Sequence, residues 1–168
     1  MSRRIARSRA IGGYEGTLRA ILHALKYDGR RSLAHPLAER MRENGQSILE
    51  GAHVTVPVPL HASRRRERGF NQAGDLAEHL GLPVVHALRR VRPTAPQVSL
   101  AAARRHANVR DAFRATRAAR QLAGKIVVIV DDVSTTGATL EACARALDGA
   151  GTIEMRALTA ARVVTRLQ

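Results

Sequence analysis

The chain has 168 residues, which suits one domain with a buried core and is too short for two ordinary ones. Its 28 Lys and Arg against 14 Asp and Glu give a net charge of +14, nearly all of the positive part from arginine. A single cysteine excludes an internal disulfide framework, and no apolar run is long enough for a membrane span or a secretory signal. We therefore expect a soluble, cytoplasmic protein whose one cysteine, Cys143, is a small buried helix residue.

The first half of the chain alternates helical and strand patterns. Residues 1–12 are basic and predict a mobile N-terminal arm, which leaves 13–168 as the single domain. Leucine and isoleucine at positions 18, 21, 22 and 25 predict an amphipathic helix over 16–26. Further along, the patterns predict a helix from Pro36 to Gly45, a strand over 53–60 and a helix over 71–80.

The second half contains the clearest strand. Residues 88–115 are polar and basic, and they precede the apolar run KIVVIV at 125–130. Because that run is apolar on both faces, it predicts a central parallel strand. A helical stripe from Leu140 to Leu147 follows, and residues 152–164 predict one more strand, with room for an edge partner. Alternating strands and helices predict an α/β fold, an open, mainly parallel, twisted sheet flanked by helices.

Two adjacent acids, Asp131 and Asp132, directly follow KIVVIV. Like charges in consecutive positions repel, and nothing in the apolar run neutralises them, so we expect a ligand to do so. Open α/β sheets bind ligands beyond the carboxyl ends of their strands, where this pair should lie. On this hypothesis, asparagine at either position preserves the fold and weakens ligand binding.

Small residues separate the acids from the next helix. They are Ser134, Thr135, Thr136, Gly137, Ala138 and Thr139. Their size lets backbone N–H groups approach an anion at a helix N-terminus, and the hydroxyls add donors. The pattern predicts a phosphate cradle, on a ligand that carries both phosphate and diol. The alternative is an ordinary capping turn with Asp132 as the cap. The sequence has neither a P-loop nor a GxGxxG motif after a strand.

The segment VVIVDDVSTTGAT, residues 127–139, resembles the signature of type I phosphoribosyltransferases, which bind 5-phosphoribosyl 1-diphosphate (PRPP). Three more segments resemble the ComF family, related to competence proteins of bacterial DNA uptake. They are KYDGRRSLAHPLAERM at 26–41, VPVPLHASRRRERGFNQAGDLAEHL at 56–80 and LRRVRPTAPQVSLAAARRHANVRDAF at 88–113. The resemblance runs from about Tyr14 to the end of the chain. Many ComF proteins begin with a cysteine-rich zinc segment that this chain lacks, so roles that depend on it are not implied.

The resemblance implies a role for each matching residue. Asp131 and Asp132 would bind the ribose hydroxyls, and the residues from Ser134 to Thr139 would hold the 5-phosphate. The residues that would face the diphosphate or order its loop are Pro59, Leu60, Arg68, Asn71 and Gln72. The residues in the place of the flexible catalytic loop are Arg90, Arg92, Thr94 and Gln97, of which the two arginines are the catalytic candidates. For Arg64, Arg65 and Arg66, a ligand role and a solvated basic face are equally compatible with the sequence. His61 and His106 are expected to be incidental.

The predicted function is therefore an Mg²⁺-dependent phosphoribosyltransferase of nucleotide or nucleoside metabolism that displaces diphosphate from ribose C1. The diphosphate would carry the Mg²⁺, so no metal-ligating residues are predicted. The acceptor is left open, with a nucleobase among the candidates. The alternative is a PRPP-sensing or DNA-uptake accessory protein with little or no turnover. The arginine-rich surface fits either non-specific DNA contact or biased base composition, and a homodimer is compatible with the sequence.

Overall fold

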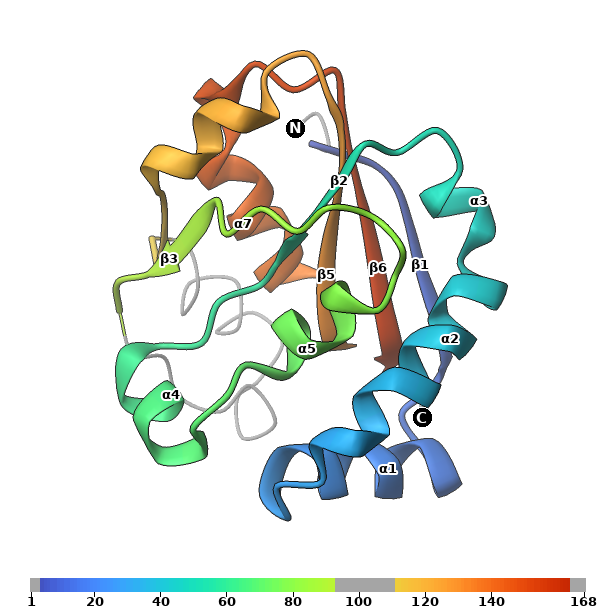
Figure 1. The fold of residues 1–168 in the computed structure, drawn as a ribbon. Helices are drawn as coiled ribbons and strands as arrows, with labels where there is room; N and C mark the ends of the chain where they lie inside the picture. Colours follow the sequence, from blue (N-terminus) through green and yellow to red (C-terminus); the bar gives the residue numbers. More distant parts are fainter. Residues whose placement is uncertain (1–3, 93–110, 164–168) are drawn as a thin grey trace.

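The structure, a computed structural model, describes residues 4–92 and 111–163. Its strands are β1 (Ile5–Gly13), β2 (Val54–Pro57), β3 (Leu88–Arg90), β4 (Phe113–Ala115), β5 (Ile126–Ser134) and β6 (Glu154–Arg162). Four of them form a parallel sheet in the order β1-β6-β5-β2, and β3 and β4 form a separate antiparallel pair (Figure 1). A parallel sheet with helices on both faces confirms the predicted α/β fold class.

The helices cover the two faces of this sheet. They are α1 (Gly16–Tyr27), α2 (Ala34–Asn44), α3 (Gln46–Leu49), α4 (Ala62–Arg68), α5 (Gln72–Glu78) and α7 (Ala138–Ala146), with short 3-10 turns η1 (Arg31–Leu33), η3 (Arg117–Leu122) and η4 (Asp148–Ala150). α1, α2 and α5 bury apolar residues against one face, and α7 packs on the other. None of the helices in the described ranges is both long and apolar enough to cross a membrane.

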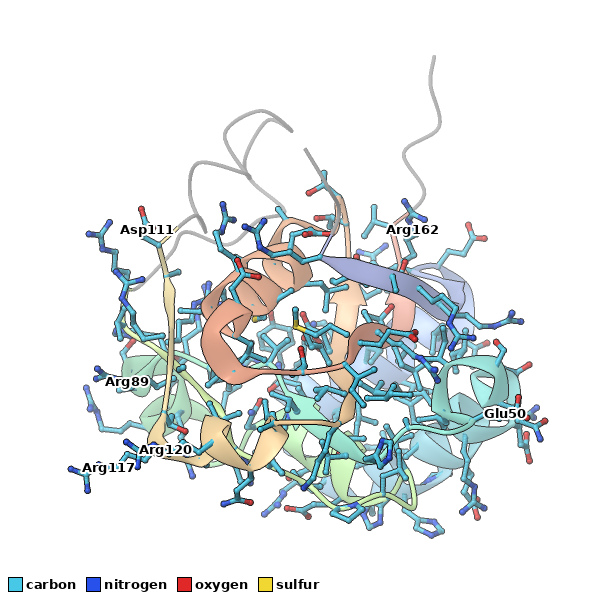
Figure 2. All side chains as sticks on the ribbon, turned by 90° about the horizontal axis from the view of Figure 1, so that it is seen from above. Glu50, Arg89, Asp111, Arg117, Arg120 and Arg162 are labelled. Atoms are coloured by element: carbon cyan, nitrogen blue, oxygen red, sulfur yellow. The ribbon has the colours of Figure 1, made fainter. Side chains whose placement is uncertain are left out.

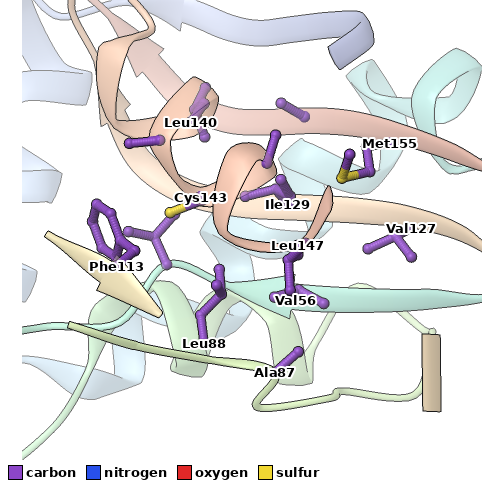
Figure 3. Close-up of a cluster of buried hydrophobic side chains, with 14 of the residues drawn as sticks. Val56, Ala87, Leu88, Phe113, Val127, Ile129, Leu140, Cys143, Leu147 and Met155 are labelled. Carbon is purple, nitrogen blue, oxygen red and sulfur yellow. The ribbon is translucent and has the colours of Figure 1, made fainter. Parts of the chain in front are cut away.

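β5 divides the hydrophobic core in two. Val127 and Ile129 face α7, in the cluster that Figure 3 shows together with Phe113 of β4. Val128 and Val130 face the opposite side, where α1, α2 and α5 pack. All four β5 residues are fully buried, which confirms the prediction of a strand that is apolar on both faces. Cys143 of α7 is also buried and unpaired, as predicted.

The predicted N-terminal arm over residues 1–12 is wrong for most of its length. Ile5–Gly13 form β1, the edge strand that pairs in parallel with β6. β6 is almost wholly buried, so the backbone groups on its outer side need a hydrogen-bonding partner. As the edge strand, β1 keeps most side chains in its first half exposed, which gives it the basic, polar pattern of an arm.

Two further elements lie where the sequence predicted only turns and loops. α4 forms within the basic segment after β2, and the side chain of His61 caps it by accepting a hydrogen bond from the Ser63 N–H at 3.4 Å. His61 therefore has a structural role in α4, which the sequence did not predict, and it is not among the residues that line the cavity described below. The β3–β4 pair lies within the basic stretch 88–115. An isolated bridge between His61 and Arg90 sets the start of α4 beside β3, next to the carboxyl end of β2.

Candidate functional site

A cavity of about 200 Å³ opens beyond the carboxyl ends of β2 and β5. The predicted site residues that line it are Pro59, Leu60, Arg68, Asn71, Gln72, Arg90, Asp131, Asp132, Thr135 and Thr139. They come from β5, from the loop before α7, from β3 and from the segment that runs from β2 into α5. Parallel strands bring their carboxyl ends to one edge of the sheet, which is how segments far apart in sequence meet here.

β5 does not stop at the acid pair but continues through it to Ser134, paired with β6. Successive side chains of a strand point to opposite faces, so Asp131 lies on the α7 side and Asp132 on the α1 side. The Lys26 Nζ of α1 lies 2.5 Å from Asp132 Oδ2, and both side chains are largely buried. The expectation that only a ligand neutralises the pair is therefore wrong for Asp132, which has a cation of the chain itself as its partner.

Backbone groups hold both carboxylates in place. The Asp132 N–H donates to Asp131 Oδ1 at 2.9 Å, and the Val133 N–H donates to Asp132 Oδ1 at the same distance. Asp132 is thus committed to Val133 and Lys26 and does not cap α7, which excludes the capping role considered from the sequence. A hydrogen bond to an ionised carboxylate stabilises its charge.

The two acids have opposite ionisation tendencies. Burial and the neighbouring Asp132 raise the pKa of Asp131 well above its ordinary value. Burial also acts against the charge of Asp132, but the Lys26 ammonium outweighs it and lowers the pKa of Asp132. Asp132 in turn outweighs the effect of burial on Lys26 and raises its pKa. The ion pair therefore stays charged, and Asp131 is the acid without a salt bridge to a cation among those found in the described residues.

The loop before α7 has the geometry of an anion cradle. Gly137 has a φ of 80°, in the left-handed region, and α7 starts at the next residue. An added Cβ at Gly137 would meet nothing within 4 Å, so the backbone conformation, not crowding, calls for glycine. The Thr136 hydroxyl accepts from the Ala138 N–H at 3.4 Å. Ser134, Thr136 and Gly137 also border a second hollow of about 400 Å³ between β1 and α7, so the cradle is open to solvent.

Arginines from two elements surround the acids. Arg90 of β3 stacks on Phe113, with its Cζ 5.3 Å from the ring centre, and burial lowers the pKa of its guanidinium. Arg68 of α4 stacks on Tyr27 at 4.9 Å, and Arg64 of the same helix lines the cavity. Arg65 and Arg66 are exposed, as a solvated face would be. Arg92 is exposed and is not among the residues that line the cavity. Thr94, Gln97 and His106 lie outside the described residues.

Asn71 and Gln72, at the start of α5, reach the cavity from its third side. The Asn71 Nδ2 donates to the Val58 carbonyl at 3.1 Å, which ties α5 to the end of β2. Within the described residues, the buried atoms Asn71 Oδ1 and Gln72 Oε1 have no hydrogen-bond partner. A buried acceptor without a partner costs free energy, so a ligand hydroxyl or a water molecule is expected to satisfy these oxygens.

Sequence reasoning missed three polar residues of this cavity. Lys26, Tyr14 and Tyr27 line it, although no role was predicted for them. Lys26 opens the segment KYDGRR and follows the buried Leu25 of α1, which were the available signals. The same segment supplies Arg31, which forms two hydrogen bonds, of 2.7 and 2.8 Å, with Asp75 of α5. This contact joins the end of α1 to α5 on the side of the sheet where Lys26 meets Asp132.

Comparisons with known proteins identify the family of this chain. Residues 66–166 match the family model of the phosphoribosyl transferase domain. The DNA utilization protein YhgH of Salmonella typhi is 32% identical over 162 residues, covering 87% of this chain and 68% of the relative. The chain belongs to the ComF family of phosphoribosyltransferase-like proteins.

Other ComF relatives are similarly close. Competence protein F of Haemophilus influenzae is 30% identical over 162 residues, covering 90% of this chain and 71% of the relative. Competence protein ComFC of Bacillus subtilis is 28% identical over 144 residues, covering 85% and 58%. Among solved structures, the glutamine PRPP amidotransferase of B. subtilis has a TM-score of 0.46 at 24% identity, covering 74% of this chain and 26% of that one.

Proposed function

We propose that the cavity binds PRPP and that this ComF protein is an Mg²⁺-dependent phosphoribosyltransferase of nucleotide or nucleoside metabolism. One observation carries the proposal: the acid pair, Thr135 and Thr139 lie on one continuous strand, loop and helix and line a cavity that arginines also line. Gly137 lies in the same loop and borders the adjoining hollow. PRPP has a diol, a 5-phosphate and a diphosphate on a single sugar ring. The acids match the diol as hydrogen-bond acceptors, the loop before α7 matches the 5-phosphate as a donor of hydrogen bonds, and the arginines match the diphosphate in charge.

The proposed roles follow from what each residue offers. Asp131 accepts hydrogen bonds from the ribose hydroxyls, for which its partly buried carboxylate is available. Backbone N–H groups around Gly137, together with the hydroxyls of Thr135 and Thr139, receive the 5-phosphate at the start of α7. Arg90 and Arg68 face the diphosphate from β3 and α4. Asp132 positions the sugar indirectly, through the Lys26 ion pair that fixes the end of β5.

The reaction would break the bond between ribose C1 and the diphosphate oxygen, and the electron pair leaves with the diphosphate. Positive charge then develops on the sugar, and negative charge develops on the leaving group. Arg90, held on Phe113 before the ligand arrives, stabilises the departing diphosphate without having to reorganise. The Asp131 carboxylate favours the positive sugar. A nitrogen atom of the acceptor forms the new bond to C1 and then loses its proton.

The donor set suits a magnesium ion that arrives with the substrate. Mg²⁺ usually keeps several waters and binds one or two carboxylates together with substrate phosphates. Within the described residues, no three His, Cys, Asp or Glu gather as a metal site. The Asp131 carboxylate, which lines the cavity, and the unpartnered oxygens of Asn71 and Gln72 could receive waters of a hydrated ion. Bound to the diphosphate, Mg²⁺ would neutralise part of the charge of the leaving group.

The test is turnover with a panel of acceptors. The protein is incubated with PRPP, Mg²⁺ and single nucleobases, and diphosphate release is followed. Release that depends on one acceptor, and that is strongly reduced in Arg90→Met, supports the proposal. An equal rate in wild type and Arg90→Met would contradict the role given to Arg90. Arg42→Met is the matched control, because Arg42 is exposed on α2 and is not among the residues lining the cavity.

A second candidate function is favoured by the relatives, which are named for DNA utilization and competence. The protein would then be a PRPP-sensing or DNA-uptake accessory protein with little or no turnover. The same assay separates the two candidates, because an accessory protein binds PRPP without releasing diphosphate for any acceptor. A cytoplasmic location is proposed with either function, since PRPP is a metabolite of the cytoplasm.

A further inference from the structure

Four exposed arginines lie on the β3–β4 pair and on η3, which follows β4 in the chain. Arg89 of β3 and Arg114 of β4 are direct register partners, so their side chains share one face of the pair, and both are exposed. Their neighbours Arg90 and Phe113 face the opposite way, toward the cavity and the core. Arg117 and Arg120 of η3 are also exposed, and Figure 2 shows Arg89, Arg117 and Arg120 on the same side of the molecule. We call Arg89, Arg114, Arg117 and Arg120 the arginine flank.

The chain leaves the charge of the arginine flank unneutralised. None of the ion pairs in the described part of the chain involves these four residues. Like charges directly opposite each other on paired strands are destabilising, yet Arg89 and Arg114 hold such positions. A partner that carries closely spaced negative charges would remove this repulsion.

Biased composition alone does not account for the arginine flank. Residues 84–92 and 111–125, which contain it, include seven Lys and Arg and one acid, Asp111. Residues 34–50, which form α2 and α3 on the other side of the sheet, include two arginines and three glutamates. A uniform excess of arginine would raise both regions alike, whereas these two regions differ in the sign of their net charge.

We propose that the arginine flank binds the phosphate backbone of nucleic acid without regard to base sequence. Arginine forks match phosphate geometry, and a group of four suits a chain of phosphates better than one small anion. Among the described residues, the exposed large apolar side chains are Tyr27 and Ile153, and neither belongs to the flank. The flank therefore offers neither a ring for base stacking nor an apolar anchor for a membrane surface.

This surface is separate from the proposed PRPP site. The flank residues are not among those that line the cavity, although Arg89 adjoins Arg90, which lines it. The two proposals can fail independently, because a protein that does not bind PRPP can still bind nucleic acid through the flank. The experiment below therefore measures both ligands.

The test compares two double variants of equal charge. Arg89→Gln with Arg114→Gln removes the paired arginines of the flank, and Arg40→Gln with Arg42→Gln removes two exposed arginines of α2. Binding of a fluorescent oligothymidine is measured by anisotropy over a series of salt concentrations. For single strands, the logarithm of the binding constant falls with the logarithm of the salt concentration by about 0.7 for each phosphate contact. The flank variant loses two such contacts, so the magnitude of its slope should be smaller by about 1.4.

The α2 variant should keep the slope and the affinity of the wild type, and both variants should bind PRPP as the wild type does. The flank variant should be at least as heat-stable as the wild type, since it loses a like-charge pair. Equal losses of DNA affinity in the two variants would overturn the proposal, because binding would then follow net charge alone. Absence of binding at low salt, or binding of inorganic polyphosphate without the oligonucleotide, would overturn it as well.

Discussion

Asparagine at position 132 and asparagine at position 131 should have opposite effects on stability. Both substitutions keep the size of the side chain and leave an oxygen to accept the backbone N–H that each carboxylate now binds. They differ in the charge that is left behind. Asp132→Asn leaves Lys26 without its partner, whereas Asp131→Asn removes an acid whose pKa burial and Asp132 raise.

The magnitude follows from the burial of the ion pair. The side chains of Lys26 and Asp132 are 15% and 8% exposed, so water cannot replace the lost carboxylate well. Breaking a buried pair by removing one partner costs about 3 to 5 kcal/mol. For a domain of this size, each kcal/mol lowers Tm by about 2 to 4 °C, so Asp132→Asn should lower it by about 6 to 20 °C. Asp131→Asn should leave Tm unchanged or raise it.

Thermal unfolding followed by circular dichroism measures this contrast, and a double variant tests its cause. Replacing a buried pair by neutral residues is often nearly neutral for stability. Adding Lys26→Met to Asp132→Asn should therefore restore most of the lost Tm. The reasoning would be refuted if the double variant lowered Tm by the sum of the decreases in the two single variants. Equal decreases in Tm from Asp131→Asn and Asp132→Asn would refute it as well.

Three other predictions concern the cradle, the titration of Asp131 and the buried thiol. Gly137→Ala places an alanine in the left-handed region, which should lower the free energy of unfolding by about 1 to 2 kcal/mol and abolish ribose 5-phosphate binding. Gly149→Ala is the control, because Gly149 has no positive φ, and it should change neither quantity. Unfolding experiments measure the first effect and calorimetry the second. The pKa of Asp131 is higher in the folded protein than the unfolded value of about 3.9, so its protonated form stabilises the fold at low pH, and this contribution is lost as pH rises through the folded pKa. Urea unfolding from pH 4 to 8 should therefore show the wild type losing stability relative to Asp131→Asn. Burial raises the pKa of the Cys143 thiol well above its ordinary value, so a thiol reagent should label Cys143 only in denaturant. Labelling of the folded protein would contradict this prediction, because it would show that the thiol is accessible.

The sequence was most informative where burial and local pattern agree. β5 is apolar on both faces because core packs on both sides of it, and this pattern predicted its place in the sheet. The acids and the cradle could be placed because they follow that strand directly. β1 was not predicted because an edge strand forms through backbone hydrogen bonds with its neighbour, which leave no side-chain pattern in the sequence. Its exposed side chains also resemble those of a mobile arm.

The partner of Asp132 could not be predicted from local pattern. Lys26 lies more than a hundred positions earlier in the chain, and only the packing of α1 against the sheet brings the two together. α4 was missed because its seven residues bury nothing and carry no apolar stripe, so periodicity gives no signal. Contacts between distant segments decide both cases.

Calorimetric titration with PRPP tests the central claim most directly. The wild type should bind PRPP with Mg²⁺ present and bind much more weakly without it. Asp131→Asn should lose affinity by about ten- to a hundredfold, the value of a charged hydrogen bond, while its Tm is kept or raised. Folded wild-type protein that binds no PRPP with or without Mg²⁺, or Asp131→Asn that binds it as tightly as the wild type, would contradict the account.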